Sequence, residues 1–232
     1  MLIKKVIKSS AKRGTWLEIG CGEGQYLVPI SRKFRFWKCV GMDIKESNIT
    51  FLRKLIPEVQ LIHDNIESSK YDEKADLITC IGVLQYVGND HIALTNMAKL
   101  LKDNGKCILY VPVNGQIHSA FYSHLLDKNE HYEKVNERQR IYTVPELIKK
   151  VNDGGFNCET SISTYGICGR LSHELTQSLM ILITTSQWLV KILSIFTLLF
   201  ISPLIILLMT IDYNLKHSYG NGIVMILTKK AV

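Results

Sequence analysis

The sequence predicts an α/β protein built on a parallel sheet with crossover helices. Short apolar runs alternate with helix-length segments along most of the chain, which is the pattern of consecutive strand–helix–strand units. The 232 residues suffice for one such domain with a small appendage, and a composition of 47% hydrophobic and 21% charged residues indicates a folded chain. A third observation marks the appendage: residues 175–211 contain a single charged side chain, Lys191.

Seven strands are expected, each from a short run rich in β-branched and other apolar residues. In chain order they cover residues 15–19, 38–43, 59–62, 75–81, 106–112, 156–164 and 222–228. Helices are expected between them near residues 23–33, 46–56, 90–102 and 143–153. The last helix has the clearest ends, because Thr143 can serve as its N-cap, Pro145 follows at once, and Gly154 and Gly155 end it.

The segment from Asn114 to Tyr142 interrupts this alternation. It is polar, rich in histidine and tyrosine, and too long for an ordinary connection between a strand and a helix. Long polar loops on a rigid scaffold commonly carry binding or catalytic residues. We therefore expect a lid or substrate loop at 114–142.

A glycine-rich turn follows the first strand. The chain reads Glu18-Ile-Gly-Cys-Gly-Glu-Gly, and its three glycines let a nucleotide-like ligand approach backbone amides before the next helix. The dinucleotide fingerprint GxGxxG would need glycine at position 25, where this chain has Gln25. A pyrophosphate site, and with it an NAD-dependent oxidoreductase, is therefore disfavoured.

Acidic residues follow the second and third strands. Asp43 ends the second strand 19 positions after Gly24, where a carboxylate can accept both hydroxyls of a ribose. Asp64, within His63-Asp64-Asn65 after the third strand, offers a carboxylate to the exocyclic amine of adenine. Together they predict an adenosine-type ligand across the strand ends. The plainer alternatives are a helix N-cap for Asp43 and a turn residue for Asp64.

At these residues the chain resembles the class I S-adenosylmethionine-dependent methyltransferases, over roughly residues 14–165 and the final strand. The turn from Glu18 to Gly24 resembles their motif I, Gly41-Met-Asp43 their ribose-binding acidic motif, and residues 76–85 their motif IV. The resemblance implies a Rossmann-like, seven-stranded, mostly parallel sheet with helices on both faces and an antiparallel last strand. It also implies S-adenosylmethionine as cofactor, and no metal is expected.

The resemblance further implies a set of cofactor-binding residues at the ends of the first four strands. Gly20 and Gly22 are expected under the methionine part of the cofactor, with Cys80 and Ile81 at its border. The chain departs from many relatives at Gln85-Tyr86, where they carry Glu-His, so any role of that histidine does not transfer. The full expected set is Glu18, Gly20, Cys21, Gly22, Gly24, Asp43, Ile44, Asp64, Asn65, Cys80, Ile81 and Gln85.

Catalytic residues are expected in the lid. Transfer to an oxygen or carbon acceptor is helped by a base near the methyl group. His131-Tyr132-Glu133 resembles the lid of related sugar and small-molecule methyltransferases, so His131 and Tyr132 are the candidates, with an ordinary surface histidine as the alternative. The six cysteines form no CxxC pair and lie mostly in apolar runs, which predicts buried thiols and a reducing compartment.

The apolar segment predicts contact with a membrane. Ile192 to Ile211 is a run of 20 uncharged residues, which meets the length of about 20 residues needed for a span. Strands six and seven belong to one sheet, so the chain must enter and leave on the same side, and a single crossing is excluded. Two crossings need about 60 Å of helix, whereas 37 residues give about 55 Å at a rise of ~1.5 Å each. A shallow hairpin at the membrane surface is expected, with a helical pair buried in a dimer or under a lid as the alternative.

The positive charge is concentrated at the N-terminal end. Residues 1–54 hold 12 basic and 4 acidic residues, while the whole chain carries a net charge of +7. This basic region is expected to face the same anionic membrane surface as residues 175–211. Nucleic acid is not expected as a partner, because no Asn-Pro-Pro-Tyr or Asp-Pro-Pro-Tyr follows the fourth strand and no Pro-Cys nucleophile is present.

These observations predict a domain organisation and a function. Residues 1–168 and 212–232 form the cofactor-binding domain with the lid 114–142, and residues 169–211 form an apolar helical insertion. The expected activity is methylation of a lipid-linked or membrane-associated acceptor at the cytoplasmic face of the membrane. Gly169-Arg-Leu before the insertion resembles methyltransferases of bacterial surface-polysaccharide pathways, so a glycolipid or polysaccharide precursor leads. The alternatives are a quinone or isoprenoid precursor, a soluble small molecule, or a non-catalytic membrane-attached cofactor-binding protein.

Overall fold

The computed structural model describes residues 2–9, 13–113, 119–129, 140–215, 217 and 219–230. The chain divides into two compact units. The first comprises Met1–Val111, Val144–Ser161 and Val224–Val232, and the second comprises Pro112–Thr143 and Ile162–Ile223. The described part of the expected lid thus belongs to the same unit as the apolar insertion.

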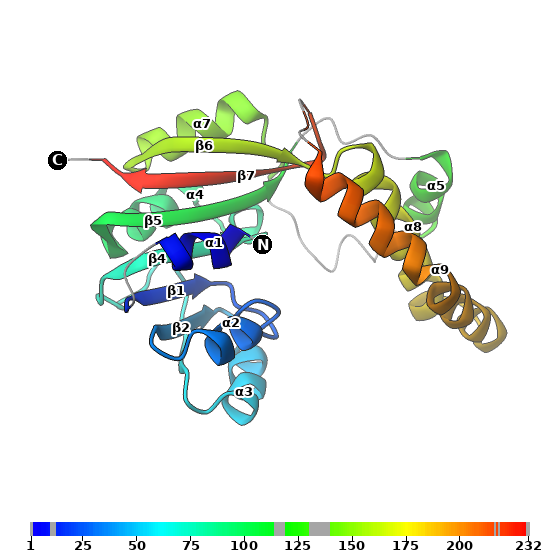
Figure 1. Ribbon diagram of the computed structural model, residues 1–232, viewed down its shortest axis with the longest axis horizontal. Helices are drawn as coiled ribbons and strands as arrows, with labels where there is room; N and C mark the ends of the chain where they lie inside the picture. The colour runs from blue at the N-terminus through cyan, green and yellow to red at the C-terminus, as the bar shows by residue number, and fades with distance from the viewer. Residues whose placement is uncertain are drawn as a thin grey trace. The chain divides into compact units, whose positions relative to one another are not determined.

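A seven-stranded sheet forms the centre of the fold, in the order β3-β2-β1-β4-β5-β7-β6 (Figure 1). Strands β1 to β5 are parallel, and β7 runs in the opposite direction between β5 and β6. This confirms the predicted sheet and its antiparallel last strand. The strands are β1 Thr15–Ile19, β2 Lys38–Asp43, β3 Gln60–His63, β4 Ala75–Ile81, β5 Leu101–Pro112, β6 Phe156–Thr164 and β7 Gly222–Lys229.

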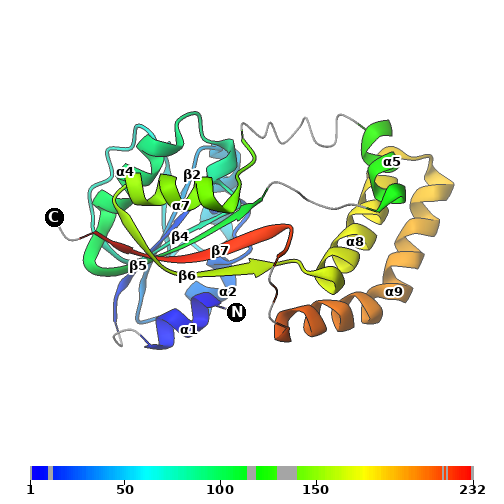
Figure 2. The same ribbon diagram turned by 90° about the horizontal axis from the view of Figure 1, so that it is seen from above.

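Helices cover both faces of the sheet. In Figure 2, α4 and α7 lie on one face and α1 and α2 on the other. The helices of this unit are α1 Leu2–Ser9, α2 Leu27–Lys33, α3 Glu46–Leu55, α4 Asp90–Leu100 and α7 Val144–Asp153, with a short 3₁₀ helix, η1, at Leu84–Tyr86. The expected helices are therefore present, with shifted ends.

The N-terminal basic segment forms α1, which packs against the core by one face. Its apolar residues Ile3, Val6 and Ile7 are buried in a cluster with Trp16 of β1, while Lys5 and Lys8 are exposed. The indole Nε1 of Trp16 donates to Thr79 Oγ1 at 2.9 Å, so the largest buried side chain has its one polar group satisfied.

Two element boundaries differ from the sequence prediction for local reasons. Helix α2 begins at Leu27 instead of residue 23, because Gly22 and Gly24 have φ values of +53° and +85° and extend the turn. Strand β5 begins at Leu101, which pairs with Ala75, but residues 102–105 bulge out before the regular ladder begins at Lys106. The predicted start at residue 106 is thus the start of regular pairing.

Within its described residues, the second unit contains the helices α5 Ala120–Lys128, α8 Ile167–Thr185 and α9 Trp188–Asn214. Helices α8 and α9 form the expected hairpin between β6 and β7, beginning before residue 169 and ending after residue 211. Helix α5 was not expected, since 114–142 was interpreted as a loop. Ser119 caps it by accepting from Tyr122 N at 3.3 Å, and its Tyr122 and Leu125 pack against Ile181 of α8.

Candidate functional site

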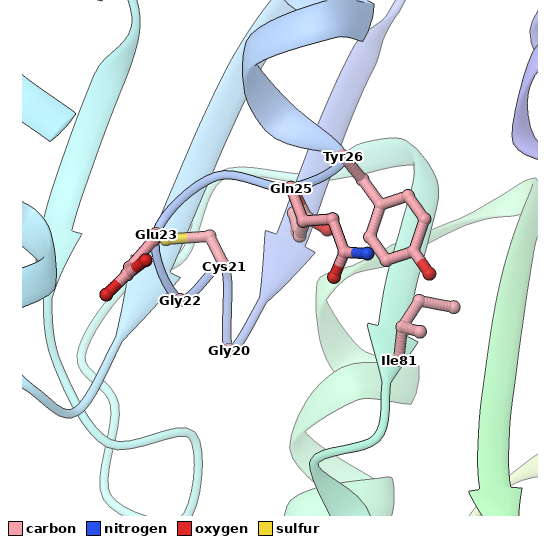
Figure 3. Close-up of a pocket in the computed structure, with 8 residues that line it drawn as sticks. Gly20, Cys21, Gly22, Glu23, Gln25, Tyr26 and Ile81 are labelled. Atoms are coloured by element: carbon pink, nitrogen blue, oxygen red, sulfur yellow. The ribbon is translucent and has the colours of Figure 1, made fainter. Parts of the chain in front are cut away.

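A cavity of about 510 Å³ opens at the carboxyl ends of β1 and β4 (Figure 3). These strands are neighbours in the sheet, so the turn after β1 and the end of β4 meet at one edge. In Figure 3 the side chains of Tyr26 and Ile81 point toward one another at this edge. The lining residues are Glu18, Gly20, Cys21, Gly22, Glu23, Gln25, Tyr26 and Ile81.

The glycine-rich turn is fixed by backbone hydrogen bonds to β2. The N–H groups of Gly20 and Cys21 both donate to the carbonyl of Met42, at 2.7 and 3.0 Å. A Cβ on Gly20 would lie 2.2 Å from Val83, and one on Gly24 would lie 2.6 Å from Leu52. Gly22 differs, because its Cβ would meet no atom within 4 Å. Gly20 and Gly24 therefore allow close packing, whereas Gly22 keeps space free beside the cavity.

Glu18 supplies a buried carboxyl group to the cavity wall. Its side chain is 2% exposed, and its Oε2 has no hydrogen-bond partner among the described residues. Burial raises the pKa of Glu18 to about 8. A buried carboxyl with a free oxygen beside a cavity suits a ligand that brings a donor or a positive charge, such as the ammonium group of an amino acid.

Asp43 connects the end of β2 to both neighbouring segments. Its Oδ2 accepts from Gly22 N at 2.7 Å, and its Oδ1 accepts from Lys45 N at 2.8 Å and from Asn48 Nδ2 at 3.2 Å. Asp43 thus ends β2 and bonds two residues at the start of α3, but the N-cap of that helix is Lys45, and no side-chain capping bond is formed there. The contact of Asp43 with a ribose stays a prediction. The carboxylate can accept further hydrogen bonds, because each of its oxygens has more than one lone-pair direction.

Asp64 and Asn65 lie in the loop after β3, outside the lining of the cavity. Asp64 Oδ1 accepts from Asn65 N at 2.8 Å, and its Oδ2 accepts from Ser69 Oγ at 2.6 Å. The backbone N–H of Asp64 donates to the carbonyl of Asp43 at 3.1 Å, which holds this loop beside the end of β2. Ile44, also expected at the cofactor, is 62% exposed. The adenine contact of Asp64 stays a prediction.

Near the end of β4, Cys80 is buried and Ile81 is half-buried. Burial raises the pKa of both Cys80 and Cys21 to about 12, so neither thiol is a nucleophile near neutral pH. Gln85 is also buried, and its Nε2 donates to the carbonyl of Gly82 at 3.0 Å while its Oε1 has no partner among the described residues. Within the described part of the chain, no group of three or more metal-binding side chains is found.

The structure adds cavity residues that the sequence analysis missed. Glu23, Gln25 and Tyr26 line the cavity, but the prediction assigned them to a helix. Their position directly around the third glycine is the signal that could have found them. The expected catalytic residues His131 and Tyr132 lie outside the described residues.

Comparison with known proteins identifies the family. A family model described as a methyltransferase domain matches residues 2–161, which is more than half of the chain. The chain belongs to this methyltransferase domain family. Among curated relatives, a ubiquinone biosynthesis O-methyltransferase of Rickettsia akari is 28% identical over 97 residues, covering 40% of this chain and 38% of the relative. The match thus spans less than half the length of that relative.

Solved methyltransferase structures share the fold. An O-methyltransferase from a trans-AT PKS multienzyme of Brevibacillus brevis, in complex with S-adenosyl-L-homocysteine, has a TM-score of 0.62 and 17% identity, covering 98% of this chain and 71% of that one. The [4+2]-cyclase SpnF has a TM-score of 0.66 and 13% identity, covering 100% and 81%. The fold alone therefore does not decide the reaction.

The family and the site confirm the predicted enzyme class and cofactor, S-adenosylmethionine. The residues present fit it: Glu18 offers the free carboxyl oxygen, and Gly22 leaves space for an approaching ligand. Bound there, the cofactor supplies a methyl group already activated on a sulfonium. The chain's part is to place donor and acceptor, and such positioning can contribute about 7 to 11 kcal/mol.

Proposed function

We propose that this protein transfers a methyl group from S-adenosylmethionine to an acceptor held in a membrane. The observation that carries the proposal is α9, a 27-residue helix whose most apolar 18-residue window has a mean hydropathy of 2.7 and is only 11% buried. Among the described residues it is the one helix long and apolar enough to cross a membrane. A methyltransferase with such an exposed surface suits an acceptor that resides in the same apolar phase.

In the α8–α9 hairpin, the distribution of polar and apolar side chains is the reverse of that in a soluble helical pair. Its buried positions are mainly small or polar, with Ser172, Ser178 and Ser194 each at most 5% exposed. Its large apolar side chains face outward, and Phe200 is 87% exposed. Small residues at helix contacts with apolar residues outside are typical of helices surrounded by lipid. This pattern favours lipid over water as the medium around the hairpin.

Polar groups on the exposed surface of α9 are satisfied within the helix. The hydroxyls of Thr197 and Thr210 donate to the carbonyls of Leu193 and Ile206, at 2.8 and 2.7 Å. Such bonds remove the cost of placing a hydroxyl in hydrocarbon without a partner.

Pro203 interrupts α9, and the helix compensates locally. Proline has no N–H to donate to the carbonyl four residues earlier, which is that of Leu199. The hydroxyl of Ser202 donates to that carbonyl instead, at 2.8 Å. Figure 2 shows that α9 bends along its length. A bent apolar helix, in a hairpin that begins after β6 and ends before β7 of one sheet, supports a hairpin that dips into one leaflet.

The basic N-terminal region is the second proposed membrane contact. Lys5 and Lys8 of α1 and Arg32, Lys33 and Arg35 at the end of α2 are exposed. A lysine or arginine near an anionic surface contributes about 1 kcal/mol to binding. We therefore propose that the protein lies at the cytoplasmic face, as a peripheral or monotopic enzyme.

Two acceptor classes follow from different observations. The relatives named for ubiquinone biosynthesis favour a quinone precursor with an apolar tail, methylated on oxygen. The Gly169-Arg-Leu sequence before the apolar hairpin favoured a glycolipid or polysaccharide precursor, but the comparisons give that class no support. A quinone precursor is therefore the first candidate. His131 and Tyr132 remain the proposed catalytic residues for removing the acceptor's proton.

The experiment uses the purified full chain, methyl-labelled S-adenosylmethionine and fractionated membrane lipids, with a soluble metabolite extract as the comparison. The proposal expects label in an extractable lipid, which mass spectrometry then identifies as a quinone precursor or a glycolipid. Label only in the soluble extract would reject the membrane-held acceptor. Cofactor binding without label in either extract would support the alternative, a non-catalytic cofactor-binding protein.

A further inference from the structure

The junction between β6 and α8 holds polar groups that the cofactor site does not use. Five buried side-chain nitrogen or oxygen atoms lack a hydrogen-bond partner in the described part of the chain. Two of them are on Glu18, which lines the cavity, and on Gln85, which is predicted to bind the cofactor. Two others, Thr164 Oγ1 and Arg170 Nε, lie six residues apart at this junction. Because buried polar groups are nearly always bonded, such a concentration indicates a place for a ligand.

The acids near Arg170 are engaged elsewhere. Glu174, one helical turn further along α8, accepts from Ser119 N with both carboxylate oxygens, each at 3.1 Å. Asp212, at the end of α9, accepts from Gly169 N at 2.8 Å and pairs with His217 at 3.2 Å. Among the described residues, Arg170 therefore has no carboxylate partner within ion-pair distance. A partly buried guanidinium in this situation calls for an anion from outside the chain.

The backbone of the junction is held in an unusual conformation. Tyr165 has a φ of +58°, and it is the one non-glycine residue with positive φ in the described ranges. Its carbonyl accepts from Asn221 N at 3.3 Å, and a Cβ on Gly220 would lie 2.1 Å from the carbonyl oxygen of Thr164. The surrounding loop thus fixes this strained residue and with it the positions of Thr164 and Arg170.

We propose that Thr164 and Arg170 bind a phosphate group carried by an amphiphile. Arginine offers a planar fork of donors that matches phosphate oxygens, and the threonine hydroxyl adds one more donor. Arg170 is in the first turn of α8, where Gly169 N donates to Asp212 in the last turn of α9, so the pair lies at the polar base of the hairpin. A phosphate at that level would have its apolar tail alongside the exposed hairpin surface.

Two sources could supply this phosphate, a membrane phospholipid headgroup or a phosphate on the lipid carrier of the acceptor. The inference rests on the proposed function only if the phosphate belongs to the lipid carrier of the acceptor. It extends the proposed function by giving the hairpin a polar anchor as well as an apolar surface.

The test measures binding to the full chain in a neutral detergent or with vesicles. Calorimetry uses geranyl diphosphate and inorganic phosphate, and sedimentation uses phosphatidylglycerol vesicles against phosphatidylcholine vesicles. Arg170→Gln is compared with Arg170→Lys, which keeps the charge without the fork, with Thr164→Val, and with the control Lys149→Gln, which removes one exposed positive charge from α7, outside the basic N-terminal region. Binding of S-adenosylhomocysteine to each variant checks that the chain is folded.

The proposal expects Arg170→Gln to weaken binding roughly tenfold or more, and both Arg170→Lys and Thr164→Val to weaken it less. Lys149→Gln should bind as the wild type does. If Arg170→Gln weakens the binding of geranyl diphosphate, the site binds the phosphate on the lipid carrier of the acceptor. If Arg170→Gln weakens only the binding to phosphatidylglycerol vesicles, the site binds the phospholipid headgroup. Equal binding by Arg170→Gln and wild type in every arm, or no binding by the wild type, overturns the site. Failure of the proposed function would show separately, as absence of labelled lipid with the wild type.

Discussion

The carboxylate of Asp43 accepts a hydrogen bond from the backbone N–H of Gly22 at 2.7 Å. This bond joins the end of β2 to the middle of the glycine-rich turn, across 21 residues of sequence. The same carboxylate also holds the start of α3 through Lys45 N. One side chain therefore fixes the turn that lines the cavity and stands where a ribose is expected.

Asp43→Ala should weaken binding of S-adenosylhomocysteine. It removes the bond to Gly22 and the expected charge-assisted bonds to the ribose, each contributing about 1.5 to 3 kcal/mol. Calorimetry on the purified chain measures the change, and Asp153→Ala, at an exposed residue at the end of α7, is the comparison. Unchanged affinity in Asp43→Ala would remove the ribose assignment.

Alanine at Gly22 and at Gly24 should separate cofactor binding from stability. Gly22→Ala should cost about 1 to 2 kcal/mol of stability, because its φ of +53° is strained for alanine but its Cβ meets nothing. Its methyl group would occupy space beside the cavity, so affinity for S-adenosylhomocysteine should fall. Gly24→Ala should destabilise more, since its Cβ would lie 2.6 Å from Leu52. Thermal melts and calorimetry together test this, and equal melting temperatures for the two variants would contradict it.

Glu18 should make both stability and cofactor binding depend on pH. Its pKa is about 8 in the folded chain against an ordinary 4.5, so between these values the folded state keeps a proton that the unfolded state loses. The resulting stabilisation is fully present below pH 4.5 and is lost as pH rises through 8. Thermal melts from pH 5 to 9 should show this decline in the wild type and a flatter profile in Glu18→Gln.

Binding of S-adenosylhomocysteine should strengthen over the same pH range, because ionised Glu18 can accept from the ammonium group of the ligand. Calorimetry in two buffers of different ionisation enthalpy should detect proton release on binding. Glu18→Gln should abolish that release and weaken binding. An identical proton count in wild type and variant would show that Glu18 does not contact the cofactor.

The sheet and the glycine-rich turn could be predicted because their signals are local. Strands such as Ala75–Ile81 are short apolar runs, and the glycines that follow Glu18 indicate the turn. Helix α5 was missed because Tyr122, Leu125 and Leu126 give only a short apolar face, which packs against Ile181, more than 50 residues away in the sequence. The lack of a hydrogen-bond partner for Glu18 Oε2 could not be predicted for the same reason, because hydrogen bonding of a side chain depends on neighbours that the fold brings together.

Polar substitutions on the exposed surface of α9 should release the protein from membranes. Leu193→Gln, Leu199→Gln and Phe200→Gln together replace side chains that are 66–87% exposed, so folding should be little affected. Flotation with anionic vesicles should show most of the triple variant in the soluble fraction, with binding of S-adenosylhomocysteine retained. Equal flotation of wild type and variant would remove α9 as the membrane contact.

The lid prediction is tested by His131→Ala. Turnover should fall by about 10²-fold or more if the imidazole removes the acceptor's proton, while affinity for S-adenosylhomocysteine should stay nearly unchanged. Steady-state kinetics and calorimetry give the two values. A parallel loss of both would indicate a structural role for His131.

The central claim is methyl transfer to an acceptor held in the membrane, and one comparison tests it most directly. The comparison uses two acceptors, a quinone precursor with its apolar tail and the same head group without the tail. The rate of methylation of each is measured with the intact chain and with a variant in which a short turn replaces residues 167–214. The account predicts that removing the hairpin sharply lowers the rate on tailed acceptor in vesicles and leaves the rate on the soluble head group nearly unchanged. Equal rates on the tailed acceptor with and without the hairpin would contradict it.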